Sequence, residues 1–479
     1  MFLGIDLGTS GVKAVLIDER QRLLAEASAP LGVSRPHDGW SEQGPADWLA
    51  ATEAALAGLA ARRPLAGVAG IGLSGQMHGA TLLDAADDVL RPCILWNDTR
   101  AAAEAAAMDA DPRFRRLTGN IVFPGFTAPK LAWVRAHEPA LFDRVARVLL
   151  PKDYLRLWLT GEAVSEPSDA SGAGWLDVAR RDWSDELLAA TAMSRAQMPA
   201  LVEGSAVSGR LRDSLAARWG MGRGVVVAGG GGDNAASGVG AGVVTAGSAF
   251  LSLGTSGVLF AASDRFRPAP ETAVHAFCHA LPETWHQMGV TLAATDALNW
   301  LGRLLGDEPA ALTAGLGPLR APGRTLFVPY LGGERTPVND AAVRGAFVGL
   351  EHATDRAAAV RAVLEGVAFA FRDSRDALAA TGTRIERALA LGGGSRSDYW
   401  LAAIATALGV TLDVPAAGDF GAAFGAARLG MMAATGAGPE IAAPPPVARS
   451  VAPDPALADA FDAAHARYTA AVAAARSLR

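Results

Sequence analysis

Half of the chain's 479 residues are hydrophobic, and its formal net charge is −6 at pH 7. A chain of this length exceeds what one hydrophobic core usually organises, so we expect two large domains. The acidic balance and the lack of a Lys- or Arg-rich run in the sequence argue against nucleic acid or an anionic membrane as a partner. Two cysteines, Cys93 and Cys278, are too few for a disulfide framework. We therefore expect small-molecule partners and a reducing, cytoplasmic location.

The first predicted element is a β-hairpin over residues 2–18, whose turn is the Gly-Thr-Ser-Gly segment at 8–11. The six residues 7–12, Leu-Gly-Thr-Ser-Gly-Val, recur unchanged at 253–258, again between apolar runs typical of strands. A repeat of this length in the same predicted context indicates two related domains.

One acid distinguishes the two turns. Asp6 precedes the first turn, whereas Ser252 stands at the matching place before the second. A turn of small residues can present backbone N–H groups and hydroxyls to a phosphate, and a carboxylate beside it can hold Mg²⁺. A hairpin turn with no ligand explains either segment equally well when it is taken alone. The presence of two such turns favours phosphate binding at both, and Asp6 favours metal binding at the first.

Two candidate sugar contacts follow a predicted helix over residues 46–62. His78 lies between predicted strands at 68–73 and 80–84, where it can bond a sugar hydroxyl or be a satisfied core histidine. Trp96 ends the next apolar run and can offer its face to a sugar ring or pack in the core. The residues alone leave both pairs of alternatives open.

Helical stretches and loops alternate over 108–200, where we expect an inserted subdomain on the sugar side. Residues 225–242 then read as a strand, a four-glycine loop and a helix, with Asp233 at the loop exit. Asp233 is therefore either a helix N-cap or a catalytic carboxylate. The uncharged stretch 234–263 is long enough to span a bilayer, but its Gly, Ser and Thr residues favour two short strands around a turn instead.

In the second half we expect helices at 290–304 and 355–380, then a strand at 388–391 that leads into a glycine loop at 392–394 and a further helix. The small residues of 418–427 predict a helix suited to close packing at a domain joint.

Two polar clusters carry no chemistry in this interpretation. His275, Cys278 and His279 lack the second Cys/His cluster that a zinc site usually needs. Glu334 and Arg335 lie in a loop, where we expect them to pair with each other.

Together these features describe a kinase. Phosphoryl transfer needs positioning, charge neutralisation and a carboxylate to take the hydroxyl proton, and Asp233 would be that base. A dinucleotide-binding enzyme is a weaker alternative, because Gly230-x-Gly232-x-x-Ala235 follows a strand but no acid ends the next strand. A P-loop kinase is excluded, since the sequence has no Gly-x-x-x-x-Gly-Lys-Ser/Thr motif. A non-catalytic sugar sensor would be expected to lose Asp6 or Asp233.

The chain also resembles the FGGY carbohydrate kinases of the actin-like ATPase superfamily over nearly its whole length. The motifs that carry the resemblance run from Gly4 to Lys13, Trp40 to Gln43, Gly75 to Gly79, Leu95 to Asp98, Leu150 to Tyr154, Gly230 to Asn234, Gly333 to Pro337 and Leu391 to Gly394. The Gln-Met-His-Gly motif is the narrowest of them, and it implies D-xylulose as the sugar, with another ketose or a polyol as the alternative.

The resemblance implies an α/β fold of two duplicated ribonuclease-H-like domains with a cleft between them: 1–240 on the sugar side and 241–479 on the nucleotide side. It further implies ATP and Mg²⁺ as cofactors, Asp233 as the base, Asp6 as the metal-side carboxylate and a homodimer. The implied sugar site comprises Met77, His78, Trp96, Asp233 and Asn234. The implied nucleotide site comprises Thr9, Lys13, Thr255, Asn299, Gly393, Gly394 and Asp398.

Overall fold

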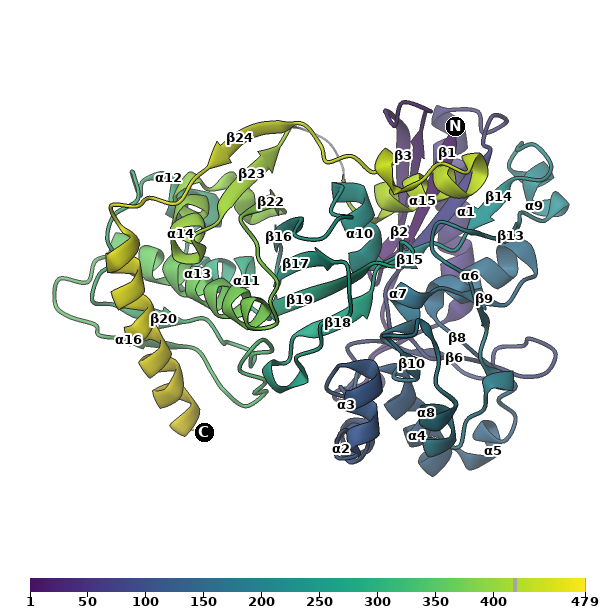
Figure 1. Ribbon diagram of the computed structural model, residues 1–479, viewed down its shortest axis with the longest axis horizontal. Helices are drawn as coiled ribbons and strands as arrows, with labels where there is room; N and C mark the ends of the chain where they lie inside the picture. The colour runs from purple at the N-terminus through teal and green to yellow at the C-terminus, as the bar shows by residue number, and fades with distance from the viewer. Residues whose placement is uncertain (417–419, 479) are drawn as a thin grey trace.

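Two mixed β-sheets organise the computed structural model, which describes residues 1–416 and 420–478. Each sheet forms the centre of one lobe, and the chain passes from the first lobe to the second after helix α10 (Asp233–Ala241) (Figure 1). The first sheet is built from β1 (Phe2–Leu7), β2 (Gly11–Ile17), β3 (Leu23–Pro30), β5 (Gly70–Gly75), β13 (Val207–Arg210), β14 (Val226–Ala228) and β15 (Gly231–Gly232). The second is built from β16 (Ala249–Leu253), β17 (Gly257–Ser263), β18 (His275–Cys278), β19 (Trp285–Thr291), β22 (Arg387–Leu391), β23 (Thr411–Pro415) and β24 (Val447–Val451).

The two sheets repeat one pattern. In the first, β1, β2 and β3 are antiparallel neighbours, and β5 and β14 extend the sheet in parallel on the other side of β1. In the second, β16, β17 and β19 are antiparallel, and β22 and β23 are parallel to β16. This confirms the predicted duplication and the two-domain α/β fold. The repeated hexapeptides differ by one residue in register, because Leu7 pairs with Val12 whereas Leu253 pairs with Gly257.

The two faces of the first sheet carry different helices. Leu3, Ile5 and Leu7 share one face and pack in the same core as Trp48 of α1 (Pro45–Arg62). The opposite face has no side chain at Gly4, where a Cβ atom would come within 1.8 Å of the Ala423 carbonyl oxygen. A helix can therefore lie directly on this face.

That helix is α15 (Ala422–Thr435), which comes late in the chain but packs on the first lobe. Its other side contacts α10, and a Cβ atom at Gly425 would come within 1.8 Å of the Ala236 carbonyl oxygen. Helix α15 therefore lies between the first sheet and α10. This confirms the predicted close-packed helix over residues 422–427, while Gly418 and Asp419 lie outside the described residues.

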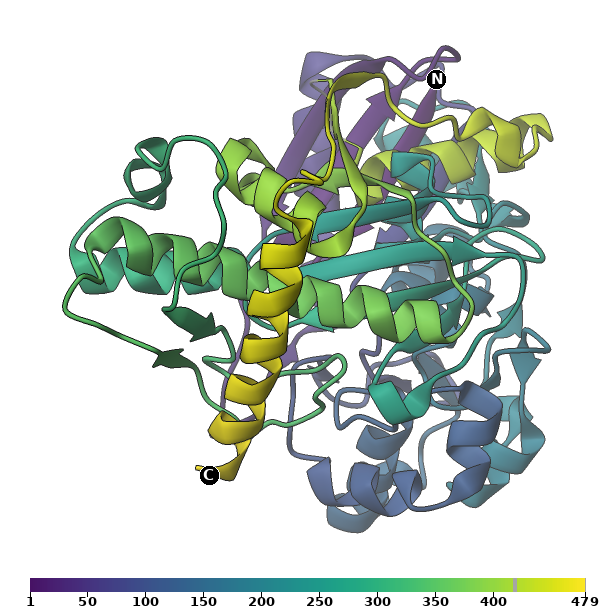
Figure 2. The ribbon, with the colours of Figure 1, turned by 60° about the vertical axis from the view of Figure 1, so that its left-hand side comes forward.

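In the second lobe, α13 (Arg356–Ala380) runs across the sheet, with α16 (Ala458–Ser477) beside it (Figure 2). The predicted helix at 290–304 is wrong at its start, because residues 290 and 291 belong to β19, which pairs with β17 and β18. Helix α11 (Thr295–Leu305) begins only after this edge pairing ends.

Shorter elements complete the chain. Much of the segment 108–200 packs in a separate core that includes Trp133, Trp175 and Trp183, whereas Leu155 and Leu159 pack in the core of the first sheet. No helix in the described parts of the chain has both the length and the apolar character needed to cross a bilayer. The remaining strand pairs are β4 (Glu42–Gln43) with β7 (Cys93–Ile94), β6 (Thr81–Leu83) with β8 (Arg147–Leu149), β9 (Val164–Ser165) with β12 (Ala200–Leu201), β10 (Leu176–Asp177) with β11 (Asp182–Trp183), and β20 (Leu326–Val328) with β21 (Ala346–Val348). The remaining helices are α2 (Ala102–Asp109), α3 (Pro112–Thr118), α4 (Thr127–His137), α5 (Pro139–Phe142), α6 (Pro151–Thr160), α7 (Pro167–Ala170), α8 (Asp185–Ala190), α9 (Asp213–Arg218), α12 (Pro309–Ala314) and α14 (Asp398–Leu408), with 3₁₀ turns at η1 (Arg195–Gln197), η2 (Pro270–Thr272), η3 (Gly393–Arg396) and η4 (Pro439–Ile441).

Candidate active site

Three neighbouring strands of the first sheet end at the same edge. Strand β5 is parallel to β1 and to β15, with Ser74 opposite both Asp6 and Gly231, and Gly75 opposite Gly232. Asp6 thus lies near the end of β1, the segment with His78 follows β5, and Asp233 follows β15 directly. Residues from three distant parts of the sequence are brought to one edge by strand pairing alone.

Asp233 is the first residue of α10, and its carboxylate is held by local bonds. Its Oδ1 accepts from the Asn234 backbone N–H (2.7 Å) and from Asn234 Nδ2 (3.0 Å). Gly232, one residue earlier, stands at the N-cap position, so Asp233 is the first residue of the helix rather than its N-cap, although its carboxylate does accept from the N–H of the second helical residue. Burial raises the pKa of the Asp233 carboxyl to about 6. A carboxylate with this pKa can act as a general base near neutral pH.

His78 is neutral and its ring is oriented by two contacts. Its Nδ1 lies 2.8 Å from the Gly172 carbonyl oxygen, and its ring stacks on Phe126 with centroids 4.9 Å apart. Because a carbonyl oxygen only accepts, Nδ1 carries the hydrogen and Nε2 is left as an acceptor. Burial lowers the pKa of His78 to about 3, which keeps the ring uncharged. A neutral imidazole with one acceptor nitrogen suits a sugar hydroxyl.

Gly172 is a residue that sequence reasoning missed. A Cβ atom there would lie 2.2 Å from the His78 ring, so only glycine allows the imidazole to sit against this carbonyl. Gly172 and His78 are 94 residues apart, and no pattern in the sequence joins them.

Thr9, Gln76 and Trp96 form a hydrogen-bonded group. Trp96 Nε1 donates to Thr9 Oγ1 (2.9 Å), which in turn donates to Gln76 Oε1 (2.9 Å). Gln76 Nε2 then donates to Gln43 Oε1 (2.8 Å). Trp96 is 48% exposed, so its ring is open to a ligand rather than part of the core. Thr9, expected at the nucleotide, is thereby joined to two residues from the motifs of the sugar side.

Met77 and Lys13 have supporting positions. Met77 is buried, and its Cγ and Sδ lie 3.0 Å from where a Cβ of Gly232 would be, so it packs against the loop that leads to Asp233. Lys13 stands opposite Asp6 in the hairpin, and its Nζ pairs with Glu26 at 3.1 Å.

Two buried side chains, Arg156 and Ser168, form hydrogen bonds with the backbone of the glycine loop. The buried Arg156 guanidinium donates to the carbonyl oxygens of Ala228 and Gly229, and Ser168 Oγ accepts from the Gly232 N–H (3.1 Å). These bonds fix the backbone just before Asp233. The motif from Leu150 to Tyr154 lies beside Arg156 in the sequence, but nothing in its composition indicates contact with residues more than 70 positions later.

In the second lobe, the two glycine-containing loops also lie side by side. Ser252 of β16 pairs with Leu391 of β22, so the turn at 254–256 and the loop at 392–394 leave the same edge. A cavity of about 420 Å³ opens here. It is lined by Asn234, Ser237, Phe250, Ser252, Ala390, Leu391, Gly392, Ser395, Val414, Pro415, Ala416, Phe420 and Gly421. The cavity therefore reaches from the loops of the second lobe to the residue that follows Asp233.

The two glycines predicted to bind nucleotide differ in their surroundings. A Cβ at Gly393 would meet nothing within 4 Å, so this backbone faces open space. A Cβ at Gly394 would lie 2.8 Å from Leu253 Cβ and 3.0 Å from the Trp400 ring. Gly394 thus serves packing, and Gly393 can serve a ligand.

None of the predicted nucleotide residues lines this cavity, although Gly392 and Ser395, which flank the two glycines, do. The Thr255 carbonyl accepts from the N–H groups of Ala294 (2.9 Å) and Asp296 (3.2 Å) at the start of α11. Asn299 lines a separate hollow of about 440 Å³ along α11. The Asp398 side chain is 85% exposed and pairs with Arg449 at 2.7 Å.

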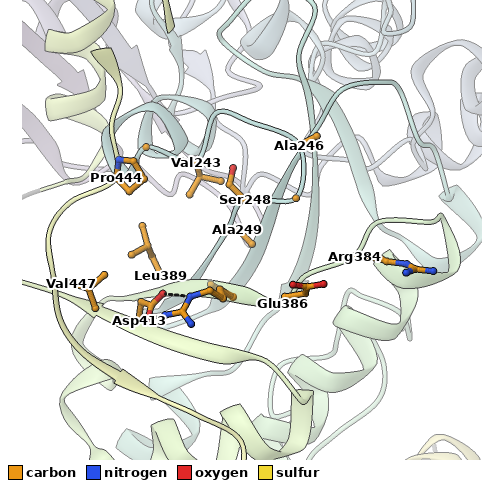
Figure 3. Close-up of a pocket in the computed structure, with 14 residues that line it drawn as sticks. Val243, Ala246, Ser248, Ala249, Arg384, Glu386, Leu389, Asp413, Pro444 and Val447 are labelled. Atoms are coloured by element: carbon orange, nitrogen blue, oxygen red, sulfur yellow. Dashed lines mark hydrogen bonds and ion pairs between the residues drawn. The ribbon is translucent and has the colours of Figure 1, made fainter. Parts of the chain in front are cut away.

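A further cavity of about 490 Å³ lies at the opposite end of the same strands (Figure 3). Ala249 and Arg387 line it, and they are the first residues of β16 and β22. Its Arg387 is bound to Asp413 by two hydrogen bonds of 2.6 and 3.0 Å, so these charges satisfy each other. No predicted site residue lines this cavity.

The expected pairing of Glu334 with Arg335 takes a different form. Glu334 Oε1 accepts from the Arg335 backbone N–H (2.6 Å), and the Arg335 guanidinium lies 4.0 Å above the ring of Phe123.

Comparison with known proteins identifies the family. The model for the FGGY family of carbohydrate kinases, N-terminal domain, matches residues 1–240, and the C-terminal domain model matches 249–434. The chain is 51% identical to the xylulose kinase of Escherichia coli K12 over 437 residues, covering 91% of this chain and 90% of that protein. It is 52% identical to the xylulose kinase of Klebsiella pneumoniae, covering 90% of each. A solved xyloylose kinase from Brucella ovis superposes with a TM-score of 0.98 at 60% identity, covering 100% of both chains. This chain belongs to the FGGY family of carbohydrate kinases, which transfer a phosphoryl group to a sugar.

Proposed function

We propose that this enzyme transfers the γ-phosphoryl group of Mg-ATP to D-xylulose, giving D-xylulose 5-phosphate and ADP in xylose catabolism. The observation that carries the proposal is the pairing of β5 with β15, which brings the His78 segment and Asp233 to one edge, with the cavity of the second lobe beginning at Asn234. The names of the similar enzymes from E. coli and K. pneumoniae support D-xylulose as the acceptor.

In the proposed reaction Asp233 is the general base. The acceptor hydroxyl oxygen attacks the γ-phosphorus, the bond from that phosphorus to the ADP oxygen breaks, and the hydroxyl proton passes to the Asp233 carboxylate. The raised pKa of about 6 makes Asp233 a better proton acceptor than an ordinary aspartate, yet leaves it ionised at neutral pH. His78 and Trp96 orient the sugar, and Asn234 fixes the carboxylate through its two N–H donors.

Asp6 is the residue that would hold Mg²⁺. It lies near the end of a buried strand, beside a turn of small residues, and Mg²⁺ is commonly held by one or two carboxylates together with water and substrate phosphates. Within the described residues, no group of three His, Cys, Asp or Glu side chains is arranged to hold a metal, which suits a metal shared with the nucleotide rather than a closed protein site. When bound, Mg²⁺ supplies positive charge that neutralises the phosphates.

The cavity at the second lobe is the proposed ATP site. Its volume lies in the range of small-molecule sites, Gly392 of the glycine loop lines it, and the open face of the neighbouring Gly393 allows a phosphate or a base to approach the backbone. Thr9, Lys13, Thr255, Asn299 and Asp398 remain predictions for this site.

A substrate panel tests the function. ADP release is measured with Mg-ATP and D-xylulose, D-ribulose, L-ribulose, D-fructose, L-rhamnulose or glycerol, together with a blank that lacks sugar. We expect kcat/KM to be highest for D-xylulose. A higher value for another sugar would keep the kinase and replace the substrate, and no turnover with any of them would contradict the proposal.

The proposal includes a homodimer that works in the cytoplasm, both expected from the family resemblance and the cysteine content. Light scattering at micromolar concentration tests the first point, since a dimer has twice the chain mass of 49.1 kDa. Cell fractionation tests the second.

A further inference from the structure

Arg335 is a partly buried cation whose guanidinium forms an aromatic contact but no ion pair within 4 Å, although the neighbouring Glu334 carboxyl interacts with it electrostatically from farther away. Its guanidinium lies 4.0 Å above the ring of Phe123 in the other lobe. Among the described residues, no carboxylate lies within 4 Å of it, and its guanidinium nitrogens have no hydrogen-bond partner in the chain. By contrast, the buried guanidinium of Arg100 is paired with Asp98 and Glu42. A desolvated cation without such partners is costly unless a ligand supplies the acceptors.

The backbone around Arg335 is firmly held, whereas its side chain is not. The buried Glu334 carboxyl accepts from the backbone N–H groups of Arg335 (2.6 Å) and Leu292 (2.9 Å) and from Thr291 Oγ1 (2.6 Å). On the other side, the Thr336 N–H donates to the Val290 carbonyl (3.0 Å). Both neighbours of Arg335 are thus tied to the end of β19, which gives a rigid base from which one side chain projects.

The Arg335 side chain projects towards the part of the site that contains His78. Phe123 contacts Phe126 edge-on with centroids 5.7 Å apart, and Phe126 stacks on His78. Burial is the main cause of the lowered pKa of His78, and the charge of Arg335 adds to it. The ring contacts from Phe123 through Phe126 to His78 place Arg335 on the His78 side of the site.

We infer that Arg335 is a sugar-binding residue supplied by the second lobe, whose guanidinium donates hydrogen bonds to the oxygens at the end of the ketose away from the phosphorylated hydroxyl. This inference rests on the proposed function, since it requires a sugar acceptor bound between His78 and Asp233. A planar guanidinium offers two parallel N–H donors, which match neighbouring hydroxyl and carbonyl oxygens of a ketose. Because the residue comes from the second lobe and the other sugar contacts come from the first, the sugar bridges the two lobes.

The test compares Arg335→Gln and Arg335→Lys with the wild-type enzyme. Arg344→Gln is the matched control, because Arg344 is exposed and its guanidinium donates to the nearby backbone carbonyls of Ala341 and Val343. For each protein we measure kcat, KM for D-xylulose and KM for ATP, the affinity for D-xylulose without nucleotide by calorimetry, and the midpoint of thermal unfolding.

For Arg335→Gln we expect KM for D-xylulose to rise roughly tenfold to a hundredfold, as for the loss of hydrogen bonds from a charged donor, with KM for ATP changed less than twofold. Arg335→Lys should recover part of the loss, because it restores the charge but not the two-pronged geometry, and Arg344→Gln should equal wild type.

Three results would overturn the inference. An unchanged KM for D-xylulose would remove Arg335 from the sugar site. A lower unfolding midpoint with both KM values raised would make its role structural. A fall in kcat alone would assign it to the transferred phosphoryl group. If wild type turns over no ketose, the proposed function fails first and this inference with it, whereas an active wild type with an insensitive Arg335→Gln variant refutes only the inference.

Discussion

Replacing Asp233 by asparagine removes the negative charge of the side chain but nearly keeps its size and shape. Asparagine keeps an oxygen that can accept the two bonds from Asn234, so α10 should begin as before. It cannot take a proton, and loss of a general base typically lowers kcat by about 10²- to 10⁴-fold. We therefore expect Asp233→Asn to bind D-xylulose with near-normal affinity and to lose turnover.

The same change should raise the free energy of unfolding at pH 7. Burial raises the pKa of Asp233 from 3.8 to about 6, and at about 1.36 kcal/mol per unit the ionised carboxylate costs the folded state up to ~3 kcal/mol. Between pH 6 and pH 4 the folded protein binds more protons than the unfolded chain, so wild type regains this free energy as the pH falls through that window. Asp233→Asn has no such proton to bind, and its advantage over wild type should shrink at pH 4.

Three measurements check this prediction: ADP release at saturating substrates, calorimetric sugar binding, and thermal unfolding at pH 7 and near pH 4. Asp459→Asn is the matched control, because Asp459 also lies in the first turn of a helix, α16, but is exposed. A kcat within threefold of wild type, with sugar binding intact, would refute the role of Asp233 as the base.

Further predictions concern the pH profile and the two ligand sites. For wild type, kcat/KM should fall about tenfold per pH unit below the pKa of about 6, as Asp233 becomes protonated, and a profile flat down to pH 5 would contradict its titration. His78→Ala should raise KM for sugar about tenfold or more, with little change in KM for ATP, and the reverse pattern would place His78 outside the sugar site. Gly393→Ala should fold normally and raise KM for ATP, whereas Gly394→Ala should lower the unfolding midpoint, because only the second substitution meets side chains. Equal unfolding midpoints for these two variants would contradict that distinction.

The sequence predicted the features that depend on local pattern. The repeated hexapeptide predicted both hairpins, and the run from Val225 to Gly242 predicted a strand, a glycine loop and a helix with Asp233 at the loop exit. The structure starts the helix at Asp233 and pairs Gly231–Gly232 of the loop as β15. Each of the predicted elements is determined within a few residues of the chain by turn chemistry and the alternation of apolar side chains. Their placement at one sheet edge was not predicted and comes from the pairing of β5 with β1 and β15.

Features that depend on contacts between distant residues could not be predicted in this way. Thr9 and Trp96 are 87 residues apart in the sequence, yet Trp96 donates a hydrogen bond to Thr9. This bond joins Thr9 to a predicted sugar residue rather than to the nucleotide site where it was expected. Asp398 does begin a helix after a glycine loop, as predicted, but its side chain pairs with Arg449 from a strand much later in the chain. Whether a carboxylate in the first turn of a helix faces a ligand or a surface arginine depends on the rotation of that helix, which the sequence pattern does not determine.

The joint between the lobes leads to a last prediction, on Gly425. This glycine lets α15 contact α10, and a methyl group there would come within 1.8 Å of the Ala236 carbonyl oxygen. Backbone atoms cannot give way as a flexible side chain can, so Gly425→Ala must push α10 away from α15 or distort one of the helices. Overpacking of this kind costs about 1–3 kcal/mol or more. Because α10 begins at Asp233, the same displacement should also move the base.

Gly70→Ala distinguishes these two effects. Its methyl group would also collide with α15, 2.3 Å from the Gly430 carbonyl oxygen, but it comes from the start of β5 in the first sheet rather than from α10. Both variants should unfold at lower temperature than Gly315→Ala, whose methyl group meets nothing within 4 Å. Only Gly425→Ala should combine lower stability with a lower kcat measured well below its unfolding temperature. If the two variants lose kcat to the same extent, the loss comes from general disruption, and α10 does not couple the joint of the lobes to the position of Asp233.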